Sequence, residues 1–153
     1  MASLVEQIRI VPFAPADQAA VRELILDGLR EHWGAIDPDR NADLVKIAES
    51  YASGVFLVAW QGDRVVGTGA LVPVDADTAE IKRMSVARDQ RRQGVGRAIL
   101  GELLARAHAA SFRRVILETT STWQEAVDFY LSNGFRITHQ RDGDTFFVRE
   151  LVS

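Results

Sequence analysis

The sequence predicts an α/β (α+β) fold, in which a mixed, mostly antiparallel sheet of about seven strands is flanked by four helices. Three observations lead to this prediction: short alternating apolar runs bounded by turn residues, stretches with a helical apolar period, and one such helix set between two strands. Hairpin turns predict antiparallel pairing, whereas the helix between strands predicts one parallel crossover. The expected order is β-α-α-β-β-β-α-β-α-β-β.

Composition indicates one globular domain over residues 1–153, with 47% apolar and 25% charged residues. The absence of cysteine excludes disulfides, a thiolate nucleophile and cysteine metal sites. The net charge of −3 argues against nonspecific nucleic-acid binding, and no apolar run is long enough to span a membrane. We therefore expect a cytoplasmic protein that acts on neither nucleic acid nor membrane. The sequence leaves open whether it forms a homodimer.

The first third of the chain is predicted to form a strand and two helices. Residues 5–13 alternate between apolar and polar side chains, which predicts the strand. Pro15 and Asp17 are typical of a helix start and Gly34 of a helix end, so the first helix is expected between them. A second helix is expected over residues 38–52, with one apolar side. That side consists of Leu44, Ile47, Ala48 and Tyr51.

The rest of the chain alternates strands with two more helices. The runs 55–61 and 64–74 are rich in β-forming residues and are joined by a Gly-Asp pair, which predicts a tight hairpin. The later segments are a strand at 78–87, a helix at 94–110, a strand at 113–119 and a final hairpin of 135–140 with 145–151. Thr122 and Glu125 have the spacing of a capping box before a short fourth helix, which Asn-Gly ends.

A basic loop with two glycines precedes the third expected helix. Gly94 and Gly96 lie at the helix start, where unpaired N–H groups and the helix dipole favour a bound phosphate. Between Lys82 and Arg97 the chain carries one acid, Asp89, against six bases: Lys82, Arg83, Arg88, Arg91, Arg92 and Arg97. The dinucleotide and Walker patterns are both absent, since Ile99 stands where the former needs glycine and no Lys-Ser/Thr pair follows the loop.

What remains is R-x-x-G-x-G, formed by Arg91, Gly94 and Gly96 after a strand. This resembles the acyl-CoA pyrophosphate loop of the GNAT superfamily of N-acyltransferases. A second signature of that family is similar to the late segment Ala126-x-x-Phe129-Tyr130-x-x-x-Gly134-Phe135. The order of elements also matches the GNAT fold over essentially the whole chain, so we expect that fold here.

The resemblance implies that acetyl-CoA is the cosubstrate and that no metal is bound. The residues implied for the pyrophosphate loop are Arg91, Arg92, Gln93, Gly94, Val95, Gly96 and Arg97. In the family the pantetheine arm pairs with the end of the preceding strand, which here is Met84, Ser85 and Val86. The chain departs from the family at Trp123, because many members have an asparagine three residues before the motif alanine.

Two catalytic residues are implied by the same resemblance. Glu80 lies fourteen residues before Gly94, the spacing of the strand glutamate that some members use as general base, directly or through water. Tyr130 matches the tyrosine that acts as general acid toward the CoA sulfur. The alternatives are a solvent-exposed glutamate at a strand start and a tyrosine that only packs in the core.

The expected function is an acetyl-CoA-dependent N-acetyltransferase, in which a primary amine attacks directly in a ternary complex because no cysteine can carry the acyl group. The acceptor is expected to be a small amine or an amino group of a peptide or protein. The alternatives are a catalytically inactive acyl-CoA-binding module and an enzyme that uses another acyl-CoA. An acidic acceptor side would attract a cationic amine. The acids expected there are Glu23, Asp27, Glu31, Asp37, Asp39, Asp43 and Glu49.

Overall fold

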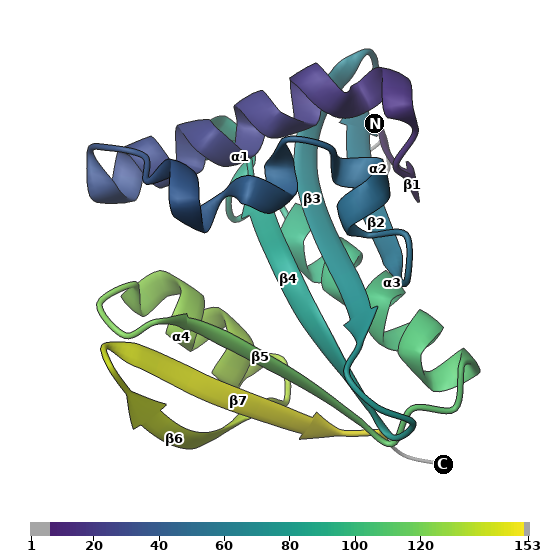
Figure 1. Ribbon diagram of the computed structural model, residues 1–153, viewed down its shortest axis with the longest axis vertical. Helices are drawn as coiled ribbons and strands as arrows, with labels where there is room; N and C mark the ends of the chain where they lie inside the picture. Colours follow the sequence, from purple (N-terminus) through teal and green to yellow (C-terminus); the bar gives the residue numbers. More distant parts are fainter. Residues whose placement is uncertain (1–6, 152–153) are drawn as a thin grey trace.

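The computed structural model describes residues 7–151, and its strands form one seven-stranded sheet. The strands are β1 (Ile8–Pro12), β2 (Val55–Gln61), β3 (Arg64–Pro73), β4 (Thr78–Val86), β5 (Arg114–Thr120), β6 (Arg136–Arg141) and β7 (Asp144–Glu150). They are ordered β1-β2-β3-β4-β5-β7-β6 (Figure 1). Only β4 and β5 pair in parallel. The expected mixed sheet and its single parallel crossover are confirmed.

Helices cover both faces of this sheet. They are α1 (Gln18–Trp33), α2 (Ile47–Ser50), α3 (Val95–Ala109) and α4 (Gln124–Ser132). Neighbouring residues of β2 point to opposite faces, so Leu57 packs in the core with α3 and α4 while Val58 packs in the core with α1 and α2. The four-helix arrangement predicted from the sequence is confirmed, and the bounds of α1 and α3 lie within a few residues of those expected.

The helix expected over residues 38–52 is wrong for most of its length. Two 3₁₀ turns, Pro38–Arg40 and Ala42–Leu44, precede α2, which has only four residues. The side-chain amide of Gln18 donates to the carbonyls of Leu44 and Val45 at 2.7 and 3.1 Å. Its oxygen accepts the N–H of Ile47 at 3.0 Å. The Gln18 side chain therefore supplies hydrogen bonds that these two carbonyls and this N–H would otherwise make within a continuous helix.

Two smaller expectations also differ from the structure. The capping box of Thr122 and Glu125 does not form, because Trp123 is the residue that precedes α4 and no side chain caps that helix start. Glu125 therefore stands one position too early in the helix, and its carboxylate pairs instead with Arg92 at 3.2 Å. The start of the strand expected at residues 5–13 lies outside the described residues.

A bulge in β4 separates this strand from its neighbour β5. Arg83 has a φ of +56°, and the register with β3 is irregular at this point. The hydroxyl of Thr68 donates to the Arg83 carbonyl at 2.8 Å and holds the bulge in place. β4 pairs with β5 only over Thr78–Glu80, and beyond these residues the two strands diverge (Figure 1). The divergence leaves room for a cavity inside the sheet.

The side chain of Arg83 ties this bulge to the segment before α2. Its Nε and Nη2 donate to the Asp43 carboxylate at 2.9 and 2.6 Å, and the Tyr51 hydroxyl donates to the same group. Burial opposes ionisation of Asp43, but the hydrogen bonds from Arg83 and Tyr51 outweigh it and lower the pKa of that carboxyl. Asp43 is therefore ionised at neutral pH and fastens the 3₁₀ segment to the sheet.

Replacing Asp43 with asparagine should destabilise the fold by about 1.5–3 kcal/mol at pH 7, because a charge-assisted pair is lost. A carboxyl whose pKa is lowered on folding stabilises the protein above its unfolded pKa. The difference should therefore be complete at neutral pH and vanish as the pH falls well below 3.8, the ordinary value. Urea unfolding at several pH values measures it. The control is Asp39→Asn on the same segment, and equal losses for both variants would contradict the assigned role.

Candidate active site

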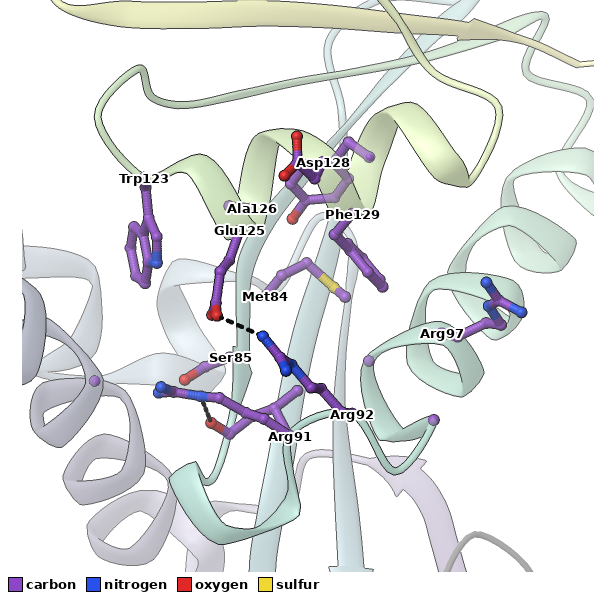
Figure 2. Close-up of a pocket in the computed structure, with 15 residues that line it drawn as sticks. Met84, Ser85, Arg91, Arg92, Arg97, Trp123, Glu125, Ala126, Asp128 and Phe129 are labelled. Atoms are coloured by element: carbon purple, nitrogen blue, oxygen red, sulfur yellow. Dashed lines mark hydrogen bonds and ion pairs between the residues drawn. The ribbon is translucent and has the colours of Figure 1, made fainter.

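A cavity of about 620 Å³ lies between the end of β4, the start of α3 and the exposed side of α4 (Figure 2). Gly28 of α1 closes one side. Nine of the residues expected at the site line it: Met84, Ser85, Val86, Arg91, Arg92, Gly94, Gly96, Arg97 and Tyr130. Two signatures that are far apart in the sequence therefore meet in one place.

Three expected residues lie elsewhere. Val95 is 1% exposed and packs into the core beneath α3, so only its backbone is near the loop. Gln93 is exposed at the loop surface and does not line the cavity. Glu80 lines neither this cavity nor the one beside it.

The helix start is shaped by its two glycines. Gly94 has a φ of +87° and immediately precedes α3, a conformation that a side chain would strain. A Cβ placed on Gly96 would lie 3.5 Å from Phe129 and 3.5 Å from Val86, which is ordinary contact distance. The first turn of α3 thus faces α4 across the cavity, and the Phe129 ring of α4 lies within contact distance of Gly96. Its unpaired N–H groups and dipole are suited to an anion.

The three loop arginines differ in how their guanidinium groups are occupied. Arg91 makes two hydrogen bonds to Glu31 of α1, at 2.8 and 3.0 Å, and these hydrogen bonds lower the pKa of that carboxyl. Arg92 reaches Glu125 at 3.2 Å and is largely exposed. Arg97 lies apart on α3 and forms no ion pair within residues 7–151 (Figure 2). Arg91 therefore connects the loop to α1, whereas Arg92 and Arg97 are more accessible to a ligand.

Tyr130 is 7% exposed and packs edge-on against the rings of Phe129 and Phe135, at 5.2 and 5.8 Å between centroids. Burial raises the pKa of its phenol, so the hydroxyl stays protonated throughout the physiological range. Despite this burial, Tyr130 lines both cavities of the site. Tyr130 therefore lies where the two cavities adjoin.

The second cavity, of about 240 Å³, occupies the gap between β4 and β5 under α1. It shares Gly28, Met84, Ser85, Trp123 and Tyr130 with the first. Its charged lining residues are Lys82, Arg83 and Glu118. The sequence pattern drew no attention to Glu118, because its part in the cavity depends on where β5 leaves β4.

Sequence reasoning also missed several lining residues of the larger cavity. Glu125 and Asp128 lie on the turns of α4 that face the loop, and Gly28 lies on α1. Ala126 and Phe129 belong to the second signature, which was the available signal for them. Trp123 stands out in the sequence only as a departure from the family pattern, yet it lines both cavities.

The acidic acceptor side expected from the first two helices is wrong. None of its seven acids lines either cavity. Six of them pair with bases instead: Glu31 with Arg91, Asp43 with Arg83, Glu23 and Asp27 with Arg30, Asp37 with Arg40, and Glu49 with Lys46. These carboxylates hold the N-terminal segment together rather than surround a substrate.

Residues 7–151 contain neither a metal-binding cluster nor a membrane-spanning helix. No group of three or more His, Asp or Glu side chains in this part of the chain has a geometry suited to a metal ion. No helix in the same range is both long and apolar enough to cross a membrane.

Comparison with known proteins identifies the class to which this fold and site belong. The profile of the acetyltransferase (GNAT) family matches residues 19–135, and the chain therefore belongs to this family. Among its relatives is the N-acetyltransferase 8F1 of Rattus norvegicus, with 36% identity over 106 residues. That alignment covers 65% of this chain and 48% of the rat protein, so the chain spans about half the length of the relative.

Solved structures show the same fold. A GNAT-family acetyltransferase from Staphylococcus aureus Mu50 superposes with a TM-score of 0.87 at 24% identity, covering 95% of this chain and 99% of that one. The paia N-acetyltransferase of Thermoplasma acidophilum, solved with coenzyme A, gives a TM-score of 0.83 at 16% identity over 94% and 99% of the two chains. The expected GNAT fold is confirmed.

Replacing Gly96 with leucine should weaken CoA binding at least about tenfold, because the added side chain would enter the space between α3 and α4. Folding should survive, since the Cβ itself meets its neighbours at ordinary contact distance. Calorimetric titration with CoA measures the affinity. Gly101→Leu is the matched control, because that glycine is on the same helix with nothing within 4 Å of its Cβ position. Unchanged CoA affinity in the Gly96 variant would contradict this location of the CoA site.

Proposed function

We propose that this protein is an acetyl-CoA-dependent N-acetyltransferase that transfers the acetyl group to a primary amine by direct attack. The observation that carries the proposal is the position of Tyr130. Its buried, protonated hydroxyl lies where a cavity at an anion-binding helix start meets a second cavity in the β4–β5 gap. One cavity suits the donor and the other the acceptor, and the thioester would lie between them.

The larger cavity supports binding of the donor. The N–H groups at the start of α3, with the accessible guanidinium groups of Arg92 and Arg97, match the charge of a pyrophosphate. Beyond the bulge, Met84, Ser85 and Val86 line this cavity and lead from the loop toward Tyr130. An extended pantetheine arm laid along this strand would bring its sulfur to the tyrosine. The CoA complex of the Thermoplasma relative, at 16% identity, is consistent with this assignment.

The chemistry needs a neutral amine and a protonated leaving group. The amine nitrogen attacks the thioester carbonyl, the C–N bond forms, and the C–S bond breaks as the tetrahedral intermediate collapses. Tyr130 gives its phenolic proton to the departing thiolate and regains one from solvent. The amine loses one proton before attack and a second on collapse, so one proton is released overall. Because Glu80 lines neither cavity, we propose that it accepts the amine proton indirectly.

The assay that tests this function is thiol release from acetyl-CoA in the presence of pooled primary amines, with the acetylated product identified by mass. Amine-dependent thiol release is expected. An acyl-CoA-binding module without catalysis would bind CoA in calorimetry and release no thiol. An enzyme for another acyl group would release thiol faster from propionyl-CoA or succinyl-CoA than from acetyl-CoA.

Replacing Tyr130 with phenylalanine should lower kcat by about 10²-fold or more and leave CoA affinity nearly unchanged, because only the proton donor is removed. The aromatic packing around the ring would be retained. Steady-state kinetics and CoA titration give the two quantities. The comparison variant is Tyr51→Phe, which removes the other tyrosine hydroxyl of the chain. Tyr51 lines neither cavity but bonds to Asp43, the partner of Arg83, so this variant measures how far a purely structural loss lowers kcat. Equal turnover in wild type and the Tyr130 variant would exclude the tyrosine as the acid.

Replacing Glu80 with glutamine should lower kcat/KM. It should also abolish the decrease of kcat/KM at low pH that protonation of Glu80 causes. Burial raises the pKa of Glu80, with a further contribution from Glu118, so this base becomes protonated at a pH above 4.5, the ordinary value. Activity that depends on it is therefore lost as pH falls through the raised pKa. The same burial makes the ionised carboxylate costly for the fold, so the glutamine variant should have a Tm at pH 7 no lower than wild type. An unchanged pH profile would show that Glu80 takes no proton from the acceptor.

A further inference from the structure

The three charged side chains of the β4–β5 cavity differ in their partners. The Lys82 ammonium lies 4.0 Å from the Glu80 carboxylate, and the Arg83 guanidinium holds Asp43 through two hydrogen bonds. The Glu118 carboxylate forms neither an ion pair nor a hydrogen bond with any residue in 7–151, and the residue is exposed. Glu118 is therefore the charged group of this cavity that remains available to a ligand, and its charge selects a cation.

Glu118 owes its position to the divergence of the two strands. Ile116 is the last residue of β5 that pairs with β4, opposite Glu80. Glu118 comes two residues later, on the same face of β5 but without a β4 neighbour, and so borders the gap. Tyr130 and Met84 line the same cavity. A proton acceptor on β5 and a proton donor on α4 thus face one space that is continuous with the donor cavity.

The remaining wall of this cavity combines three hydroxyl-bearing residues, Ser85, Thr119 and Thr120, with apolar and aromatic side chains. Its apolar members include Ile25, Leu29, Trp33, Leu117 and Trp123. The Trp123 ring stacks on His32 of α1, with 4.5 Å between centroids and 10° between planes, so the aromatic wall joins α4 to α1. Trp33 of α1 lines the same cavity and is 53% exposed. Such walls favour an acceptor with an apolar body beside its amine.

We propose, resting on the function proposed above, that Glu118 is a catalytic residue that binds the ammonium group of a primary amine carried on an apolar body and accepts its proton. The ammonium gives one proton to the Glu118 carboxylate, and the neutral amine then attacks the thioester. Glu80 acts through Glu118, as the next acceptor of that proton. The charge of Glu118 already acts on Glu80. This order explains how Glu80 takes part without lining the cavity.

Two acceptors of nearly the same shape test the proposal. Phenethylamine is an ammonium ion at pH 7, whereas O-benzylhydroxylamine, with an oxygen in place of one methylene, is neutral and needs no base before attack. Glu118→Gln should lower kcat/KM for phenethylamine by about 10²-fold or more, and for O-benzylhydroxylamine by less than about tenfold. CoA affinity should not change. The control Glu102→Gln replaces an exposed carboxylate of α3 that lines neither cavity, and should leave both rates as in wild type.

Each other outcome overturns the proposal. An equal loss for both acceptors would mean that Glu118 only shapes the cavity, and no loss would mean that another group binds and deprotonates the amine. If wild type acetylates amines from the pool but neither of these two, the apolar acceptor class is wrong while the proposed function stands. If wild type releases no thiol with any amine although it binds CoA, the proposed function itself fails.

Discussion

The whole site depends on the short stretch over which β4 and β5 are paired. They pair in parallel over three positions, and β4 is bulged at Arg83 beyond them, so backbone that would otherwise pair within the sheet faces a cavity. This bulge is held by Thr68 from one side and by the Arg83–Asp43 pair from the other. Without the divergence, a ligand could not reach a residue in the middle of the sheet from both faces.

The packing around α3 explains why the start of this helix lies at the opening between β4 and β5. A Cβ on Gly67 or Gly69 of β3 would come within 3 Å of α3 side chains, so these glycines let the helix lie close against the strand. The anion-binding end of α3 is thereby placed beside the end of β4. Arg91 continues the connection by reaching Glu31, which ties the loop to α1. The proposed donor and acceptor cavities consequently share α1 as a common wall.

Burial raises the pKa of both Tyr130 and Glu80, and the consequence for the proposed proton transfer differs between them. At Tyr130 it raises the pKa of a group that must stay protonated, so the core position and the acid role agree. At Glu80 it raises the pKa of a carboxyl that must lose its proton, which costs the fold stability at neutral pH. Glu118 differs from Glu80 in being exposed. The two glutamates therefore have different proposed roles, direct and indirect proton acceptor, because their surroundings differ.

The sequence by itself determined the element order, the parallel crossover and the two signatures, because alternation, helical period and glycine turns are local properties. Most residues of the donor cavity, from Met84 to Tyr130, followed from those signatures and line it in the structure. Only the tertiary structure decided the acceptor side. The segment before α2 is broken because Gln18, distant in sequence, pairs its backbone, and the N-terminal acids are taken up by arginines from other elements. Glu118 joined the site because β5 diverges from β4, a fact of strand pairing that no local pattern contains.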